Sequence, residues 1–234
     1  ILQHQRRETF LPSLDKAYAL GNNTAGLLLA DYYISLASNP DEMKQARDIY
    51  QSMAALGNQD AQLKLAYLYE QGLGGSVDLE KAAQWYTMSA EQGLPMAQYL
   101  LGHFYQLGGV TNKPDYVEAK KWYHLAEATY APAAVALGFI YDTVDDDYAN
   151  ALVGYQRAAT ADDAVGQFNA GLIYEEGKGL PVDEKKATAL YLQAASHGHA
   201  QAMVQLAGLY LNAQRDPDEA LRWYKKAADL GARD

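Results

Sequence analysis

The chain has 234 residues and contains no cysteine, so it forms no disulfide bonds. This absence fits a protein that avoids thiols in an oxidising compartment, and it fits the cytosol equally well. Basic residues are also few, since 19 Lys and Arg stand against 29 Asp and Glu, for a net charge of −10. Nucleic acid and anionic membrane surfaces are poor partners for such a chain, so we expect a protein partner, and a basic one.

Segments suited to cross a membrane are missing as well. The uncharged stretch 128–141 has fourteen residues and is interrupted by Pro132. Because a membrane-spanning helix needs about 20 apolar residues, this stretch is too short to cross a bilayer. We therefore expect no membrane insertion.

The motifs of common catalytic sites are absent too. The glycine loops 72–75 and 177–179 lack the spacing of a phosphate-binding loop and follow a helical pattern. The segment His-Gly-His (197–199) has no third metal ligand nearby, and Asp-Asp-Asp (145–147) lacks the alternation and distal glutamate of a calcium loop. We interpret the former as solvated turn residues and the latter as a solvated loop with helix-capping acids. We predict no enzyme activity, no metal site and no cofactor.

Two series of tyrosines recur at a nearly constant interval. Each tyrosine of the first series is the second residue of a doublet that begins with tryptophan or with another uncharged residue. Successive tyrosines of this series are 36, 37, 32, 36 and 33 residues apart. The second runs in parallel, with intervals of 36, 36, 36, 33 and 36 residues. The members are Tyr50, Tyr86, Tyr123, Tyr155, Tyr191 and Tyr224, and then Tyr33, Tyr69, Tyr105, Tyr141, Tyr174 and Tyr210. Two series with one period predict a tandem repeat array, which is first of all a binding surface.

Each repeat has the pattern of two helices. In the second repeat, apolar residues recur every three or four positions over 61–72 and again over 82–93, which is the period of amphipathic helices. We call the first helix of a repeat helix A and the second helix B. A glycine such as Gly57 or Gly93 follows helix B at the position that favours a left-handed residue. We expect the tyrosines of both series, and large side chains such as Trp85, to be buried.

These residues resemble the Sel1-like repeat (SLR) family, a relative of the tetratricopeptide repeat. The family pattern A-x-x-x-L-G-x-x-Y-x-x-G-x-G, followed by K-A-x-x-W-Y-x-x-A-A-x-x-G, recurs six times. The copies begin at Ala25, Ala61, Ala97, Ala133, Gly166 and Ala202. Departures are mild: Gly154 replaces the tryptophan, Ala170 replaces the leucine, and repeats one, four and six lack the glycine loop.

The resemblance implies an all-α fold, an α/α superhelical solenoid of tandem helix-turn-helix repeats with thirteen helices. We predict one repeat array over 1–234, which we expect to be a fragment of a longer array or a processed product. Its parts are a half repeat and six repeats: 1–21, 22–57, 58–93, 94–130, 131–162, 163–198 and 199–234.

A candidate binding strip lies on helix A. Counting the leading small residue of each copy as position one, positions four and seven face the inner surface in tetratricopeptide-like stacking. Position seven is aromatic in three consecutive repeats, and acids recur at position ten as a flank for a basic partner. The alternative is that the curvature of the array buries these side chains against the next repeat. The candidate partner-binding residues are Lys64, Tyr67, Glu70, His103, Phe139, Asp142, Leu172 and Glu175.

The resemblance also implies a function. Proteins of this family look like non-catalytic scaffolds for protein–protein interaction, and bacterial members are often exported. We expect a periplasmic or secreted protein that binds an envelope or host partner, with a cell-wall enzyme as one candidate. Within the family it is similar to the envelope proteins that enhance invasion of host cells, of the EnhC type. The alternatives are a structural scaffold for polysaccharide export and a secreted SLR hydrolase, which the lack of cysteine disfavours.

Overall fold

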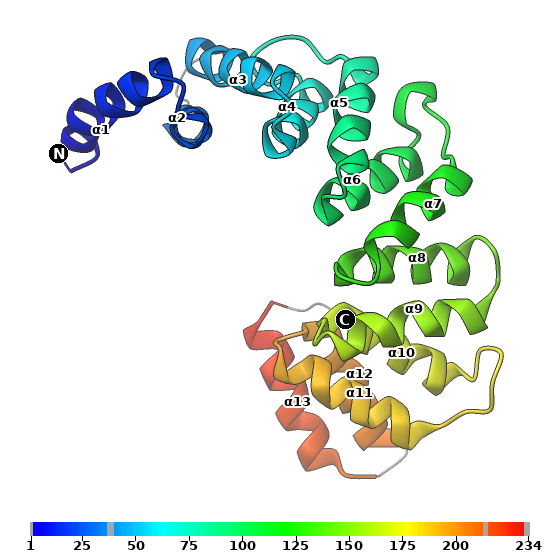
Figure 1. Ribbon diagram of the computed structural model, residues 1–234. Coiled ribbons are helices and arrows are strands. Elements are labelled where there is room, and N and C mark those ends of the chain that lie inside the picture. Colours follow the sequence, from blue (N-terminus) through cyan, green and yellow to red (C-terminus); the bar gives the residue numbers. More distant parts are fainter. Residues whose placement is uncertain (1, 37–39, 213–214, 232–234) are drawn as a thin grey trace. The chain divides into compact units, whose positions relative to one another are not determined.

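A computed structural model describes residues 2–36, 40–212 and 215–231 (Figure 1). Over these residues the chain forms thirteen α-helices and one short 3-10 turn, with no β-strand. The prediction of an all-α repeat fold with thirteen helices is therefore confirmed. Within the described part, no helix combines the length and the apolar character needed to span a bilayer.

The helices alternate between the two roles expected from the sequence. The helix that precedes the first full repeat is α1, even-numbered helices from α2 to α12 are helix A, and odd-numbered helices from α3 to α13 are helix B. Their bounds are α1 Leu2–Ala19, α2 Asn23–Leu36, α3 Pro40–Ala55, α4 Gln59–Gln71, α5 Leu79–Glu91, α6 Pro95–Gln106, η1 Gly109–Thr111, α7 Tyr116–Ala126, α8 Ala131–Thr143, α9 Tyr148–Thr160, α10 Ala164–Glu176, α11 Glu184–Ser196, α12 Ala200–Asn212 and α13 Pro217–Asp229.

The chain divides into two compact units, Ile1–Ala119 and Lys120–Asp234, which we call unit 1 and unit 2. In unit 1, each helix from α1 to α6 packs against its neighbour in sequence. In unit 2, the same holds for the helices from α8 to α13 (Figure 1). Each unit is thus a stack of antiparallel helices in which contacts are mainly local, as expected for tandem repeats.

Polar side chains begin most helices, and glycines end many of them. Asn58 accepts a hydrogen bond from the Ala61 N–H at the start of α4, and Asp78 accepts one from the Lys81 N–H at the start of α5. The stop glycines have the predicted left-handed backbone, with φ of +87° at Gly57. The cap expected at Asn39 lies outside the described residues.

The tyrosines that follow the doublet form the core. Five of the six are at most 1% exposed, and only Tyr224 of the last repeat reaches 36%. The parallel series on helix A is half-buried except for Tyr69. The expectation for Trp85 was wrong, because it is half-buried beside the fully buried Tyr86, whereas Trp122 is buried. In the doublets of repeats two and three, the tyrosine thus lies between the helices and the tryptophan lies nearer the surface, whereas in the last doublet Trp223 is half-buried and Tyr224 is exposed.

Two glycines are required by close approach between backbones. A Cβ on Gly154 would lie 2.8 Å from the Ala134 carbonyl oxygen, so the glycine that replaces the family tryptophan lets α9 contact α8 directly. A Cβ on Gly74 would lie 2.5 Å from the Met43 carbonyl oxygen, so the loop after α4 rests against the backbone of α3. The expected use of small residues for close helix contact is confirmed at Gly138, where a Cβ would come within 2.8 Å of the Tyr155 ring.

Candidate functional site

Unit 1 contains an apolar pocket with a volume of about 300 Å³. Its walls come from the helix A faces of three successive repeats, together with α3 and the loop after α4. The lining residues are Asp31, Ile34, Tyr50, Leu63, Lys64, Tyr67, Leu68, Leu73, Met96 and Leu100. A volume of this size is at the lower end for ligand sites, and it suits one or two large side chains of a partner.

Exposed apolar side chains mark the mouth of this pocket. Tyr67 of α4 is 49% exposed and Met96 of α6 is 47% exposed, although both are large and apolar in character. Position seven of repeat two and the first residues of repeat three thus lie beside each other. Exposed apolar groups that adjoin a pocket favour an interaction site.

A small polar cluster joins three helices at the edge of the same pocket. The Tyr50 hydroxyl of α3 donates to Oδ1 of Asp31 on α2 at 2.5 Å, and the Lys64 ammonium of α4 forms an ion pair with the same oxygen. The side chains of Asp31 and Lys64 remain 45% and 39% exposed. Burial raises the pKa of Tyr50, and the hydrogen bond to the Asp31 carboxylate raises it further. Tyr50 is therefore a neutral donor that holds the Asp31 side chain in place at the pocket edge.

The predicted acids at position ten also have a structural role. Glu70 accepts a hydrogen bond from the buried Tyr86 hydroxyl at 2.8 Å, and Glu175 accepts one from Tyr191 at 2.5 Å. Asp142 lies 3.5 Å from the Tyr155 hydroxyl and 3.2 Å from Lys178 Nζ. Each acid thus provides the acceptor that a buried tyrosine requires, so these acids are part of the fold as well as of the surface.

The residues of the predicted binding strip lie in different units and differ in burial. In unit 1, Tyr67 lines the pocket, whereas His103 is half-buried and stacks on Tyr99 at 6.2 Å between ring centroids. In unit 2, Phe139 is 47% exposed, and Leu172 is half-buried because it packs against the core cluster around Tyr191. The structure therefore brings Lys64 and Tyr67 together in one pocket, while Leu172 is largely a core residue.

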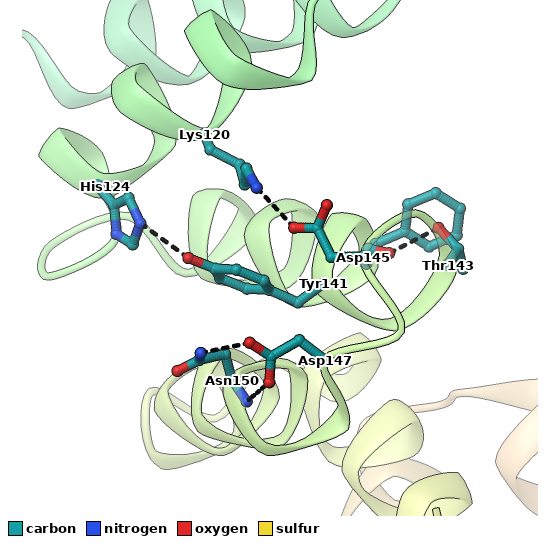
Figure 2. A network of polar contacts seen from close by, with 8 residues as sticks. Lys120, His124, Tyr141, Thr143, Asp145, Asp147 and Asn150 are labelled. Atoms are coloured by element: carbon teal, nitrogen blue, oxygen red, sulfur yellow. Dashed lines mark hydrogen bonds and ion pairs between the residues drawn. The ribbon is translucent and has the colours of Figure 1, made fainter.

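A polar network connects the first helices of unit 2 (Figure 2). Lys120 Nζ of α7 forms an ion pair with Oδ2 of Asp145 at 2.6 Å and lies 5.2 Å from the Tyr141 ring centroid. His124 Nε2 lies 3.3 Å from the Tyr141 hydroxyl. Asp147 caps α9 through the Asn150 N–H at 3.1 Å. The interpretation of this acidic loop as helix-capping is thus confirmed at Asp147, while Asp145 serves as an ion-pair partner.

The two histidines of the 197–199 segment differ in setting: His197 is an exposed turn residue, as interpreted, whereas His199 is half-buried, which corrects its interpretation as a solvated turn residue. His197 Nδ1 lies 3.2 Å from Oε1 of the buried Gln167, and His199 Nδ1 accepts from the Ala202 N–H at 3.2 Å. The His199 ring also stacks on Phe168 at 4.6 Å. In the described part of the chain, no group of three or more His, Asp or Glu residues is arranged to hold a metal ion.

Sequence reasoning missed much of the pocket. Ile34, Leu73 and Met96 were not among the candidates, although the pocket needs all three. Ile34 carried a usable signal, because it is apolar at the position where three of the other repeats have an acid. Leu73 belongs to a loop, whose path the helical period does not predict.

Tandem helix pairs with a tyrosine core and a pocket on their helix A faces define a helical-repeat scaffold. The Sel1 repeat profile matches four segments that together cover more than half of the chain, namely 59–94, 95–128, 164–199 and 200–231. The chain belongs to the Sel1 repeat family. Proteins of this family generally act as protein-interaction scaffolds and are typically non-catalytic.

Solved structures of two bacterial proteins are similar to most of the chain. One is a protective antigen of uropathogenic Escherichia coli strains with an SLR fold, 30% identical, with a TM-score of 0.81 over 93% of this chain. The chain spans about half of that protein, or 48% of its length. The other is a Sel1 repeat protein from Oxalobacter formigenes, 34% identical, with a TM-score of 0.69 over 86% of this chain and 82% of its own.

A third structure shares the fold alone. It is an immunity protein from Pseudomonas aeruginosa, 22% identical, with a TM-score of 0.52 over 86% of this chain and 78% of its own. A search of curated proteins gave no match to the chain.

Proposed function

We propose that this chain is an exported bacterial scaffold that binds a protein partner through the pocket of unit 1. The observation that carries the proposal is the apolar pocket between α2, α4 and α6, with the exposed Tyr67 at its mouth. Fully desolvated aromatic side chains dominate the affinity of many protein interfaces. Here the pocket can receive such a side chain from the partner, and Tyr67 at its mouth can itself be buried against the partner.

The setting proposed for this activity is the periplasm or the exterior of the cell. Its support is the similarity to a protective antigen of uropathogenic strains. In this setting the partner is an envelope or host protein, and a cell-wall enzyme is one candidate. A role in the invasion of host cells, as in the EnhC type, belongs to the same proposal. The net charge of −10 favours a basic partner.

Site-specific photo-crosslinking tests this proposal. A photoreactive phenylalanine analogue is placed at Tyr67, and the chain is exposed to an envelope fraction of the source bacterium and to host-cell extract. The matched control carries the analogue at Met88, which is 45% exposed on α5 of the same unit and does not line the pocket.

We expect a discrete crosslinked protein with Tyr67 and none with Met88. Equal crosslinking at both positions, or none at Tyr67, would contradict the proposal. A polysaccharide-export subunit as the crosslinked protein would support the alternative of a structural envelope scaffold.

A further inference from the structure

The edge of the unit 1 pocket has a chemistry that selects among partners. We infer that the pocket takes a large apolar side chain that lies next to a lysine or arginine in an extended segment of the partner. This inference rests on the proposed function and specifies the partner that the same site would bind.

The walls of the pocket define the apolar part of the ligand. Ile34, Leu68 and Leu100 come from three successive helix A faces, and Met96 and Tyr67 border the opening. The lining is aliphatic except for two tyrosines and the Asp31–Lys64 pair. Burial of a Leu, Met, Phe or Trp side chain of the partner in such a lining is favourable. A charged group that entered the pocket would lose its hydration and find no partner in the apolar lining.

Asp31 defines the polar part. Both of its contacts meet Oδ1, and among the described residues Oδ2 has no hydrogen-bond partner. An ionised carboxylate accepts several hydrogen bonds, so Oδ2 is available to a second cation. The Tyr50 hydroxyl comes from the buried core and keeps Asp31 in place whether or not another cation arrives.

Lys64 is the chain's own occupant of this carboxylate. Its side chain is 39% exposed and extends from α4 to α2, so it is a surface ion pair whose stability is modest. A partner cation can therefore share Asp31 with Lys64 or replace it at low cost. An arginine would suit the open Oδ2 edge particularly well, because its planar fork bonds both carboxylate oxygens.

The charge of unit 1 favours the same partner. Residues 1–119 contain 13 Asp and Glu and 8 Lys and Arg, for a formal charge of −5. The second acid near this face, Glu70, uses Oε2 for the Tyr86 hydroxyl, and no bond to its Oε1 is present in the described part of the chain. The net negative charge of unit 1 thus attracts a basic segment, which can bind the carboxylates of Asp31 and Glu70. For an acidic segment, the cation that lines the pocket is Lys64, which already pairs with Asp31.

A peptide array probed with the whole chain at low salt tests the inference. The probes are nonapeptides with a central Leu, Met, Phe or Trp, flanked by Lys or Arg, by Asp or Glu, or by Ser and Gly. We expect binding to the basic set alone. Tyr67→Ala should abolish this binding, and Asp31→Asn should weaken it at least fivefold, since asparagine retains an acceptor for Tyr50 but lacks the charge.

Two further variants separate the site from general attraction. Asp60→Asn removes the same charge from an exposed residue of α4 that does not line the pocket, and it should have little effect. Lys64→Met removes the competing cation and should strengthen binding of the basic set. Circular dichroism and thermal unfolding confirm that each variant is folded.

Preference for the acidic set, equal losses with Asp31→Asn and Asp60→Asn, or no binding by any set would overturn the inference. The proposed function is judged separately, because a partner crosslinked at Tyr67 establishes the site whatever peptides it prefers. Crosslinking at Tyr67 without a basic preference would refute only the inference.

Discussion

The two units place the same buried tyrosine in different polar surroundings. In unit 2, Tyr155 and Tyr191 donate to acids at position ten of helix A, namely Asp142 and Glu175. In unit 1, Tyr86 follows this rule with Glu70, but Tyr50 donates to Asp31 at position seven. A buried hydroxyl requires an acceptor, and the fold offers two positions from which one can reach it.

The helix A position of the acid that accepts from the core tyrosine determines whether the nearby surface is charged or apolar. Because Asp31 satisfies Tyr50 from position seven, position ten of the first repeat is free to be Ile34, which lines the pocket. In unit 2 the acids at position ten remain, and Asp142 also pairs with Lys178. When the acceptor acid lies about one helical turn earlier, at position seven instead of position ten, an apolar pocket wall thus replaces a charged surface, and the core tyrosine keeps its acceptor.

The contacts between successive repeats also differ in the two units. In unit 1, the Arg47 guanidinium lies 3.9 Å from the centroid of the Tyr69 ring on the following helix A. In unit 2, Lys120 occupies the same position of helix B and lies 5.2 Å from the Tyr141 centroid, but it also pairs with Asp145 (Figure 2). The shared position is one residue after the small alanine of helix B, so cation–aromatic contact is a recurring link between repeats.

The largest expected effect comes from a core tyrosine. Tyr86→Ala should destabilise unit 1 by ~3–5 kcal/mol, because it leaves a cavity between α4 and α5 and removes the partner of Glu70. Trp85→Ala should cost less, since Trp85 is half-buried. Hydrogen exchange should show the loss of protection near repeats two and three, because repeats couple mainly to their neighbours. Uniform loss of protection through both units would contradict a repeat array.

The next effect concerns the close contact of α8 and α9 in unit 2. Gly154→Ala should cost about 1–3 kcal/mol, because the new methyl group meets the Ala134 carbonyl oxygen and the backbone of Gly138. The matched control is Gly208→Ala in α12, where a Cβ meets nothing within 4 Å. That change should stabilise the helix by ~0.5–1 kcal/mol. Chemical denaturation measures both, and equal effects of the two variants would show that close approach at Gly154 is unimportant.

A third prediction compares the exposed aromatics at position seven. Tyr67→Ala should weaken partner binding at least tenfold, or about 1.4 kcal/mol, while helix content stays unchanged. Phe139→Ala removes a side chain of unit 2 with similar exposure that does not line the unit 1 pocket. It should therefore have the smaller effect, measured by calorimetry with the crosslinked partner. A greater loss with Phe139→Ala would move the binding site to unit 2.

The sequence was informative wherever the repeat period determines the structure. It predicted the helix pairs, the buried tyrosine series and the stop glycines, because one helical turn and one left-handed residue are local features. The exposure of Trp85 was missed, since a doublet on one helix face does not reveal which of its members enters the core. The second role of the position-ten acids was missed for a related reason: a polar residue on a helix looks solvated until its partner on the next helix is known.

Of the ten residues that line the pocket, only Lys64 and Tyr67 were among the predicted candidates. Position seven indicated Tyr67, which lines the pocket, but Leu73 and Met96 lie in a loop and at a helix start, outside the periodic positions. Departures from the repeat were the best available signal. Asp31 is an acid where neighbouring repeats have aromatics, and Ile34 is apolar where they are polar, and the two departures together create the pocket.

The smallest predicted effect distinguishes the helix caps of the two units. The residue three before position one caps helix A: it is Asn58 for α4 in unit 1 and Asp163 for α10 in unit 2, but His199 for α12 in unit 2. Burial lowers the pKa of His199 below its ordinary value of 6.5, against the opposing charge of Asp163. The neutral ring is also the form that accepts from the Ala202 N–H, so protonation removes the cap.

Because the pKa of His199 is lower in the folded than in the unfolded chain, the unfolded chain binds the extra proton first as the pH falls. Its contribution to the stability of unit 2 is therefore complete above pH 6.5 and is lost as the pH falls through the folded pKa. His199→Asn keeps a cap that does not titrate. Thermal unfolding followed between pH 7.5 and 5 should show a smaller loss of stability for the variant than for the parent. Asn58→Ala is the control for a non-titrating cap, and its effect of ~0.5–2 kcal/mol should be the same at both ends of this range. If His199→Asn and the parent lose stability in parallel, other groups carry the pH dependence, and the two caps are equivalent despite their chemistry.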